Sequence, residues 1–276
     1  MASQIQSKMP EKKDEKKEQM DQILGKIKNK LLVMSGKGGV GKSSVAANLA
    51  VLLAEKGFKV GLMDIDVHGP SIAKIMGITG LLEIDTEKQL AKPATYGENL
   101  KIVSMQSFMR EADQAVIWRG PAKSGMIQQF ITTVDWGELD FLIVDAPPGT
   151  GDEPLTIIQT IPDSKAIVVT TPQDVALSDV RKSINFCKTV KMEILGLLEN
   201  MGPFQCPHCS EEIAIFKKGG GKQTAFDMGI KFLGTLPYNA EVLNSGDSGN
   251  PVITKDKTNS YTQALEACAE QILSSL

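Results

Sequence analysis

The sequence is poor in cysteine, with four in 276 residues, which is too few for a disulfide framework in a chain of this length. It has no apolar run as long as a membrane span, and its N-terminus lacks the apolar segment of a secretory signal. These absences argue against a disulfide-stapled secreted protein and against an integral membrane protein. We therefore expect a reducing, cytoplasmic compartment and no membrane partner.

A basic excess is also lacking, because 30 Lys and Arg residues stand against 33 Asp and Glu residues, a formal net charge of −3. Proteins that track nucleic acid through its phosphates concentrate positive charge. We therefore expect no nucleic-acid partner. Hydrophobic residues make up 42% of the chain, enough for a substantial core, and the length fits one large α/β domain or two small ones.

Residues 1–28 are polar and include the dense mixed-charge run EKKDEKKE at 11–18. A segment of this composition buries little apolar surface, so we predict a flexible charged tail over 1–28, with a helical turn or two near its end. The rest of the chain, 29–276, is predicted as one domain, because no linker-like segment or internal repeat divides it.

Short apolar runs alternate with amphipathic stretches from Leu31 onward. The runs are continuously apolar, as in parallel strands that are covered on both faces. Strand–helix alternation implies right-handed βαβ units, so we predict an α/β fold with a doubly wound, mostly parallel sheet flanked by helices. The predicted strands are 31–35, 59–64, 101–105, 141–145, 166–170, 194–198 and 231–235, and the predicted helices are 42–56, 122–134, 175–190 and 259–275.

The stretch SGKGGVGKSS follows the first predicted strand and opens the first long helix, which is the context of a phosphate-binding P-loop, G-x-x-x-x-G-K-[ST]. Its glycines let backbone N–H groups face phosphate oxygens, and the helix N-terminus adds its positive end. Lys42 is predicted to bind the β- and γ-phosphates, and Ser43 to bind Mg²⁺. We predict nucleotide contacts from Gly36, Lys37, Gly38, Gly39, Val40, Gly41, Lys42, Ser43 and Ser44.

Acidic residues follow two further predicted strands, Asp64 and Asp66 in one place and Asp145 in another. A hydrophobic strand that ends in Asp beside a P-loop is typical of a Walker B carboxylate, which holds Mg²⁺. We predict that Ser43, Asp66 and Asp145 hold the magnesium ion and that Asp66 also orients the attacking water. Asp64 is either part of this site or a carboxylate that caps a loop. Because the folded part lacks the [NT]-K-x-D segment of guanine-binding proteins, ATP is the expected nucleotide.

Lys37, directly after the first glycine of the loop, resembles the signature lysine of the deviant Walker A ATPases. Further segments, among them LENMGPFQCPHC and LGTLPYNAEVLNSGDSGNPV, resemble the Mrp/ApbC-type ATPases, which are iron–sulfur cluster carriers. The resemblance covers about 28–275. It implies a homodimer in which Lys37 reaches the partner's ATP, and it implies that Asn200 reads adenine. Asn239 departs from the family's acid and is left out of the site, and the tail lacks the four-cysteine cluster of the eukaryotic cytosolic scaffolds.

The motif CPHC provides two candidate metal ligands, Cys206 and Cys209. An iron–sulfur cluster or a zinc ion normally takes four ligands, and two copies meeting at a twofold axis supply four thiolates. We predict a [4Fe-4S] cluster that bridges two subunits, with zinc as a possible substitute and a redox-active dithiol as another alternative. Cys187 and Cys268 are predicted to be buried on helices, and His208 is either an exposed loop residue or a further ligand.

The predicted function is an ATPase that holds a labile cluster and passes it to apo iron–sulfur client proteins. Lys37, Lys42 and Asp66 are the predicted catalytic residues. The alternatives are a spatial regulator of the MinD/ParA kind and an electron donor like the nitrogenase iron protein. Asp152 is a weak candidate for coupling nucleotide state to the dimer axis, and His68 is either a plain loop residue or involved in positioning water.

Overall fold

The computed structural model describes residues 11–66, 69, 71–108, 120–206, 208–254 and 256–276. Its centre is a sheet in which every neighbouring pair of strands is parallel except the pair at one edge. The predicted strands all lie in this sheet, and the predicted fold class is confirmed. In spatial order the strands are β12 (Phe232–Pro237), β9 (Ile194–Gly202), β8 (Lys165–Thr170), β1 (Ile27–Ser35), β7 (Leu139–Asp145), β2 (Val60–Asp64), β6 (Leu100–Ser104) and the antiparallel β5 (Ala94–Tyr96).

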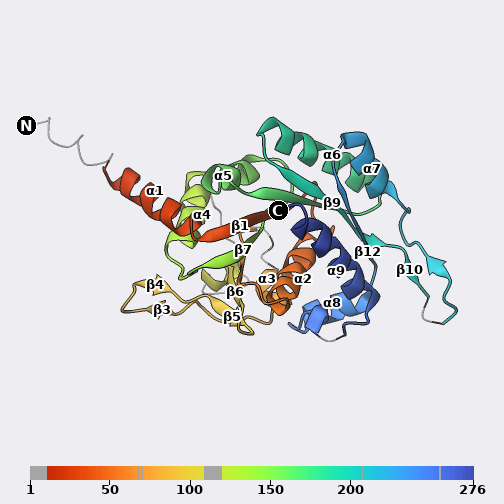
Figure 1. Ribbon diagram of the computed structural model, residues 1–276, viewed down its shortest axis with the longest axis horizontal. Coiled ribbons are helices and arrows are strands. Elements are labelled where there is room, and N and C mark those ends of the chain that lie inside the picture. Colours follow the sequence, from red (N-terminus) through yellow and green to blue (C-terminus); the bar gives the residue numbers. More distant parts are fainter. Residues whose placement is uncertain (1–10, 67–68, 70, 109–119, 207, 255) are drawn as a thin grey trace, which may run out of the picture.

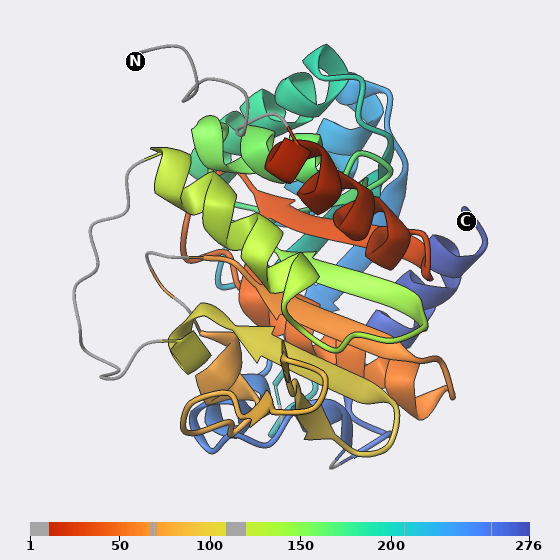
Figure 2. The same ribbon diagram turned by 90° about the vertical axis from the view of Figure 1, so that its left-hand side faces the viewer.

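Helices cover both faces of the sheet, and each face has its own hydrophobic core (Figures 1 and 2). Continuously apolar strands such as β7 supply both cores, because successive side chains point to opposite faces. One face carries α2 (Lys42–Glu55), α3 (Ile72–Ile75), α8 (Ala240–Asp247) and α9 (Ser260–Leu273), and the other carries α1 (Glu11–Leu24), α4 (Gly120–Thr132), α5 (Asp152–Thr160), α6 (Asp174–Thr189) and α7 (Gly220–Met228). Short 3₁₀ turns occur at Met105–Phe108 and Val252–Thr254.

The N-terminal segment differs from the predicted tail. Glu11–Leu24 forms α1, which lies against α4, and β1 already begins at Ile27, so the expected boundary between residues 28 and 29 falls inside a strand. Leu24 is buried, and Met20 and Ile23 pack against the same core. These few apolar side chains attach one face of an otherwise charged helix. Residues 1–10 and His68 lie outside the described residues.

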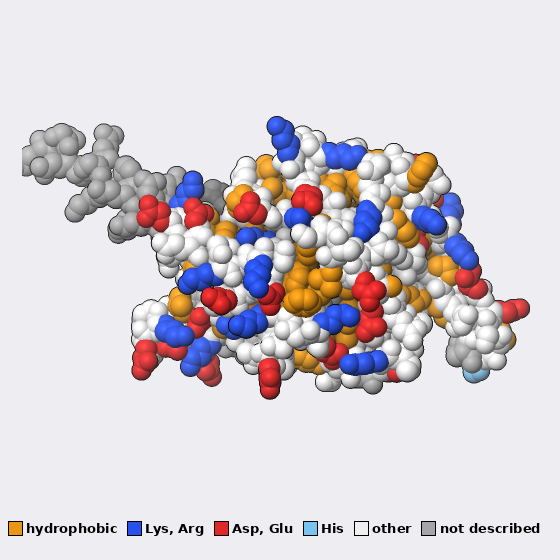
Figure 3. Space-filling model, in the orientation of Figure 1, with side chains coloured by type: hydrophobic (Ala, Val, Ile, Leu, Met, Phe, Trp, Pro, Cys, Tyr) orange, Lys and Arg blue, Asp and Glu red, His pale blue; other side chains and the backbone are white. Residues whose placement is uncertain are grey.

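Two small hairpins were not predicted from the sequence. One pairs β3 (Ile84–Asp85) with β4 (Leu90–Ala91), and the other pairs β10 (Phe204–Gln205) with β11 (Glu212–Ile213). Strands of two residues are too short to show a periodic pattern. The β10–β11 hairpin projects from the body of the molecule, at the right of the views in Figures 1 and 3.

The sheet brings the predicted functional loops to one edge. The carboxyl ends of β1, β2 and β7 are adjacent, with Val33 opposite Asp145 and Asp64 opposite Asp145 in the register. Loops at the carboxyl ends of parallel strands form the ligand sites of such folds. Among the described residues, no helix combines the length and hydrophobicity needed to cross a bilayer.

Candidate functional site

The phosphate-binding loop lies between the end of β1 and the start of α2. Gly41 has a left-handed backbone, with φ of 80°, directly before the first residue of α2. A Cβ atom at this position would lie 2.3 Å from Asn200 Nδ2, so the turn requires glycine on both counts. A Cβ atom at Gly36 would lie 2.3 Å from the Asp179 carbonyl carbon, which places the start of the loop directly against α6. Both ends of the loop are therefore held by contacts that a larger residue would prevent.

A cavity of ≈ 440 Å³ lies beside this loop. Most of the predicted nucleotide and catalytic residues line it, namely Lys37, Gly38, Gly39, Val40, Gly41, Lys42, Ser43, Ser44 and Asp66. Ser71 and Pro148 contribute from the loops that follow β2 and β7. Three predicted residues lie behind this lining: Gly36 packs on α6, Asn200 packs on the loop, and Asp145 is fully buried at the end of β7.

Lys42 connects the loop to both acidic segments. Its Nζ atom lies 2.5 Å from Asp145 Oδ1, 3.8 Å from Asp66 Oδ2 and 3.3 Å from Ser43 Oγ. Burial raises the pKa of Asp145, and the charge of Lys42 and the hydrogen bonds from Lys42 and Ser43 oppose that rise. One cation thus faces two carboxylates, an arrangement that favours a second cation.

Magnesium fits this group of residues. Mg²⁺ prefers carboxylate, hydroxyl and water oxygens, and Ser43, Asp66 and Asp145 present such oxygens around Lys42. The Asp145 Oδ2 atom is buried and has no hydrogen-bond partner among the described residues, so it retains an acceptor for a metal-bound water. Which of these groups contacts the ion directly stays a prediction.

Asp64 caps a loop, which is one of the two roles that the sequence left open. Its Oδ1 atom accepts from the Asp66 N–H group at 3.1 Å, and its Oδ2 atom accepts from the Ile72 N–H group at 3.2 Å and the Ser104 hydroxyl at 3.0 Å. Burial and the nearby charge of Asp145 raise the pKa of Asp64 to about 8. Asp64 therefore orders the segment that presents Asp66 to the cavity.

Cys206 and Cys209 lie in the loop that joins β10 to β11. The Cys206 N–H group donates to the Glu211 carbonyl at 2.8 Å, and the Ser210 N–H group donates to the Cys206 carbonyl at 2.9 Å. Cys206 is half-buried and Cys209 is exposed. Backbone N–H groups of His208 and Cys209 lower the pKa of Cys206, because they stabilise its thiolate. Two adjacent, accessible thiols of this kind can bind a soft metal ion or cluster.

His208 is exposed beside the two cysteines. Within the part of the chain that the structure describes, no three His, Cys, Asp or Glu side chains are grouped so that they could hold a metal ion.

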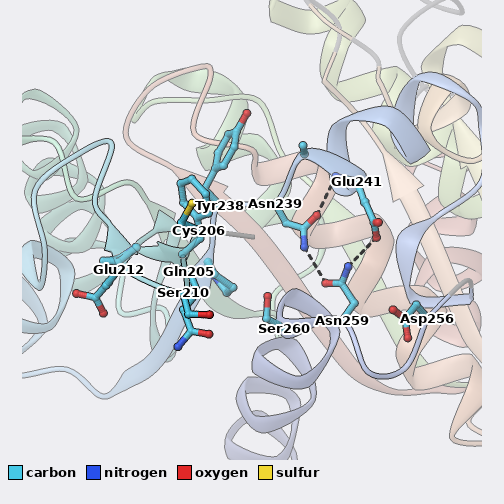
Figure 4. A pocket seen from close by; sticks show the side chains of 14 residues that line it. Gln205, Cys206, Ser210, Glu212, Tyr238, Asn239, Glu241, Asp256, Asn259 and Ser260 are labelled. Carbon is cyan, nitrogen blue, oxygen red and sulfur yellow. Dashed lines mark hydrogen bonds between the residues drawn. The ribbon is translucent and has the colours of Figure 1, made fainter. Parts of the chain in front are cut away.

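The hairpin also borders a cavity of ≈ 680 Å³ that the sequence did not predict (Figure 4). Cys206 and Glu212 lie on one side of it, and Asn239, Glu241 and Asn259 lie on the other. Asn239 Nδ2 donates to Asn259 Oδ1 at 3.0 Å, and Asn259 Nδ2 donates to Glu241 Oε2 at 2.9 Å. Asn239 and Asn259 are the N-cap residues of α8 and α9, so this polar network anchors two helix starts. An asparagine directly before a helical stretch is typical of an N-cap, and this pattern at Asn239 and Asn259 is the sequence signal that could have revealed the network.

Cys187 and Cys268 are buried on α6 and α9, as predicted. Burial raises the pKa of Cys187 to about 11 and that of Cys268 to about 12. Both residues are therefore neutral core thiols at physiological pH.

Most of the chain matches one known protein family. The sequence model described as "ParA: NUBPL iron-transfer P-loop NTPase" matches residues 26–273. The chain belongs to this family of iron-transfer P-loop NTPases. The resemblance to Mrp/ApbC-type ATPases is thereby confirmed.

Named relatives of this P-loop NTPase carry related descriptions. The chain is 44% identical to an "Iron-sulfur cluster carrier protein" of Methanococcus maripaludis, over 84% of this chain and 81% of that one. It is 48% identical to "Cytosolic Fe-S cluster assembly factor CFD1" of Kluyveromyces lactis, over 79% of each chain.

Solved structures agree with the fold. A nucleotide-binding protein from Archaeoglobus fulgidus in complex with ADP is similar with a TM-score of 0.74 and 37% identity, covering 84% of this chain and 91% of that one. The cell division ATPase MinD of Pyrococcus furiosus has a TM-score of 0.67 at 21% identity, covering 90% and 99%, which shows the fold alone.

In this iron-transfer P-loop NTPase, the signature Lys37 lies between two cavities. It lines the P-loop cavity and a second one of ≈ 720 Å³ that includes Val175 and Ile215. These two apolar side chains are 67% and 53% exposed. The Lys37 carbonyl accepts from the Ser35 hydroxyl at 3.0 Å, and its ammonium group forms no ion pair with a residue that the structure describes. The position suits a lysine that contacts another molecule, and its action across a dimer stays a prediction.

Asn200 has a structural contact that the resemblance did not indicate. Its amide donates to the Val40 carbonyl at 2.9 Å, and the residue is only 6% exposed. Asn200 therefore holds the P-loop from behind. Its proposed recognition of adenine stays a prediction.

Asp66→Asn is expected to leave ATP affinity within about threefold and to slow hydrolysis about a hundredfold. Asp66 lines the P-loop cavity and lies 3.8 Å from the Lys42 ammonium, so the change removes a negative charge where a water molecule would be oriented. Equilibrium ATP binding and phosphate release measure the two effects separately. The matched control is Asp163→Asn, because Asp163 is exposed in the turn between α5 and β8. Hydrolysis at the wild-type rate in Asp66→Asn would refute the assignment.

Proposed function

We propose that this protein binds and hydrolyses ATP, holds an iron–sulfur cluster between two copies of the chain, and passes the cluster to apo-proteins. The observation that carries the proposal is the position of Cys206 and Cys209 in the turn of a hairpin that projects from a P-loop NTPase domain. The names of the relatives support a cluster as the cargo. The same proposal places the protein in the cytosol, as the name of the K. lactis relative states for that protein.

Ligand number supports a homodimer. Each chain offers two accessible thiols in one turn, whereas a [4Fe-4S] cluster takes four cysteine ligands. A twofold axis that passes between two hairpins brings two copies of the same pair together. Lys37 and its exposed apolar neighbours Val175 and Ile215 give the same dimer a second contact, close to the nucleotide.

The residues of the P-loop perform the nucleotide chemistry in this proposal. Backbone N–H groups of the loop bind the phosphates, and Lys42 moves its charge from Asp145 to the β- and γ-phosphates. Asp66 orients the attacking water, and Lys37 of the other subunit neutralises charge that develops in the transition state. Magnesium, held by Ser43, Asp66 and Asp145, neutralises phosphate charge when bound.

Anaerobic reconstitution followed by transfer tests the proposal. Protein incubated with ferrous iron and sulfide is expected to gain the visible absorption of thiolate-bound iron and then to activate an apo-enzyme that requires a [4Fe-4S] cluster. A chelator present during transfer should not prevent activation if the cluster passes directly. Absence of bound iron, or retention of the cluster with electron transfer to the client, would contradict the carrier function.

A further inference from the structure

Two neighbouring residues of β9 connect to different parts of the molecule. Asn200 donates to the Val40 carbonyl in the P-loop. Glu199 is fully buried, and its Oε2 atom accepts from the Gly221 N–H group at 2.6 Å while its Oε1 atom accepts from the Thr235 hydroxyl at 3.1 Å. Because successive side chains of a strand point to opposite faces, β9 contacts the nucleotide loop on one face and α7 on the other.

The complete burial of the Glu199 carboxylate requires a physical explanation. Transfer of a charged group from water to the interior is unfavourable unless that group is well bonded, and an apolar side chain of the same size avoids this cost. Glu199 has no Lys or Arg partner among the described residues. It instead bonds the first turn of α7, where the helix dipole favours negative charge. The carboxylate thus fixes where α7 begins.

The segment that returns from the cysteine hairpin, 214–219, ends at the start of α7. The chain leaves β9 at Gly202, forms the β10–β11 hairpin with Cys206 and Cys209, and returns through 214–219 to α7. Both connections of the hairpin are therefore held at the same place. The outgoing one continues from the strand that carries Glu199 and Asn200, and the returning one ends at the Glu199 carboxylate.

Helix α6 provides a second contact between the P-loop and the returning segment. A Cβ atom at Gly36 would lie 2.3 Å from the Asp179 carbonyl carbon, and a Cβ atom at Gly220 would lie 2.5 Å from Leu177 Cδ1. The first turns of α6 are thus packed between the nucleotide loop and the start of α7. Both β9 and α6 therefore connect the nucleotide loop to the segment that returns from the hairpin.

We propose that Glu199 is a positioning residue that ties the start of α7, and with it the cysteine hairpin, to the strand behind the P-loop, so that nucleotide binding changes the accessibility of Cys206 and Cys209. This inference rests on the proposed function, in which nucleotide and cysteines belong to one reaction. In the proposed function Lys37 of one subunit acts on the ATP of the other, so ATP favours the dimer in which two hairpins meet, and nucleotide lowers thiol accessibility.

Alkylation of the reduced, cluster-free full chain measures the coupling. Iodoacetamide modification of Cys206 and Cys209 is followed by mass spectrometry with and without Mg–ATP, and the buried Cys187 and Cys268 serve as internal references. Coupling between two sites is typically about 5- to 150-fold, so ATP should slow modification of the wild-type cysteines at least about fivefold. In Glu199→Ala the ratio of the modification rate without ATP to the rate with ATP should fall to within about twofold of unity. The ATP affinity of this variant should stay within about threefold of the wild-type affinity.

Three further variants separate positioning from general stability. Glu199→Gln keeps one acceptor for the Gly221 N–H group and should restore most of the wild-type ratio. Thr235→Val removes one donor to Glu199 and should give an intermediate ratio, which keeps the test decisive if Glu199→Ala does not fold. Gln223→Ala removes an exposed hydrogen bond to Asp227 on α7 and should leave the ratio unchanged.

Three results would overturn the inference. They are a rate ratio near one in the wild-type protein, a wild-type rate ratio in Glu199→Ala, and loss of ATP binding in a folded Glu199→Ala. If ATP slows alkylation of the wild-type cysteines as expected but the protein binds no iron on reconstitution, the coupling stands and the carrier function is refuted. The two proposals can therefore fail separately.

Discussion

Replacing Cys206 with Ala is expected to reduce the iron bound after anaerobic reconstitution from about four atoms per two chains to background. One cysteine per chain leaves a dimer with two of the four thiolates, and the structure shows no nearby side chains, among those described, that complete the set. Cys209→Ala should have the same effect. Iron and sulfide analysis, together with the visible spectrum, measures the loss.

The buried cysteines provide matched controls. Cys187→Ala and Cys268→Ala make the same chemical change on α6 and α9, and both should keep full iron content. Retention of a full cluster by Cys206→Ala would refute the ligand assignment. One zinc ion per two wild-type chains, with no cluster formed anaerobically, would instead favour the zinc alternative.

Replacing Lys37 with Ala is expected to slow ATP hydrolysis by up to about a thousandfold with little loss of ATP affinity. A cation supplied across an interface contributes about 10³–10⁵ to the rate in arginine-finger systems, and a lysine lacks the bidentate fork of arginine. Lys37 lies at the edge of the P-loop cavity and forms no ion pair with the described residues, so its removal leaves the ion pair of Lys42 with Asp145 intact. Single-turnover hydrolysis and equilibrium binding separate the two quantities.

Mixing two inactive variants tests whether Lys37 acts across the dimer. Lys37→Ala retains its own nucleotide site, whereas Lys42→Ala cannot bind ATP but can donate Lys37 to a partner. A mixed dimer therefore contains one complete site, and the mixture should regain activity that neither variant has alone. Failure to recover activity, with mixed dimers shown to form, would mean that Lys37 acts within its own subunit or that both sites must fire together.

Local sequence pattern predicted the sheet well because strands buried on both faces form continuous apolar runs. The P-loop was predictable because its motif and its strand–helix context are contiguous in sequence, and Asp66 and Asp145 were predictable because each ends or follows an apolar strand. The β10–β11 hairpin has too few residues per strand to show a period.

The contacts of Glu199 and Asn200 depend on spatial neighbours. Gly221, Thr235 and Val40 meet β9 only because of the order of strands in the sheet. The role of Asp64 was undecided for the same reason, because its partner Ser104 comes from the adjacent strand β6. No local pattern in the sequence reports such contacts.

The central position of β1 has a consequence for biosynthesis. Its neighbours in the sheet are β7 and β8, and residues paired with it, such as Asp145 with Val33, are made long after it. The strand that carries the P-loop therefore leaves the ribosome with both of its edges unpaired and stays so until more than half of the chain has been translated. Unpaired apolar strands of this kind are aggregation-prone, and pairing of distant segments is slow. A nascent chain released before β8 should consequently depend on holdase chaperones.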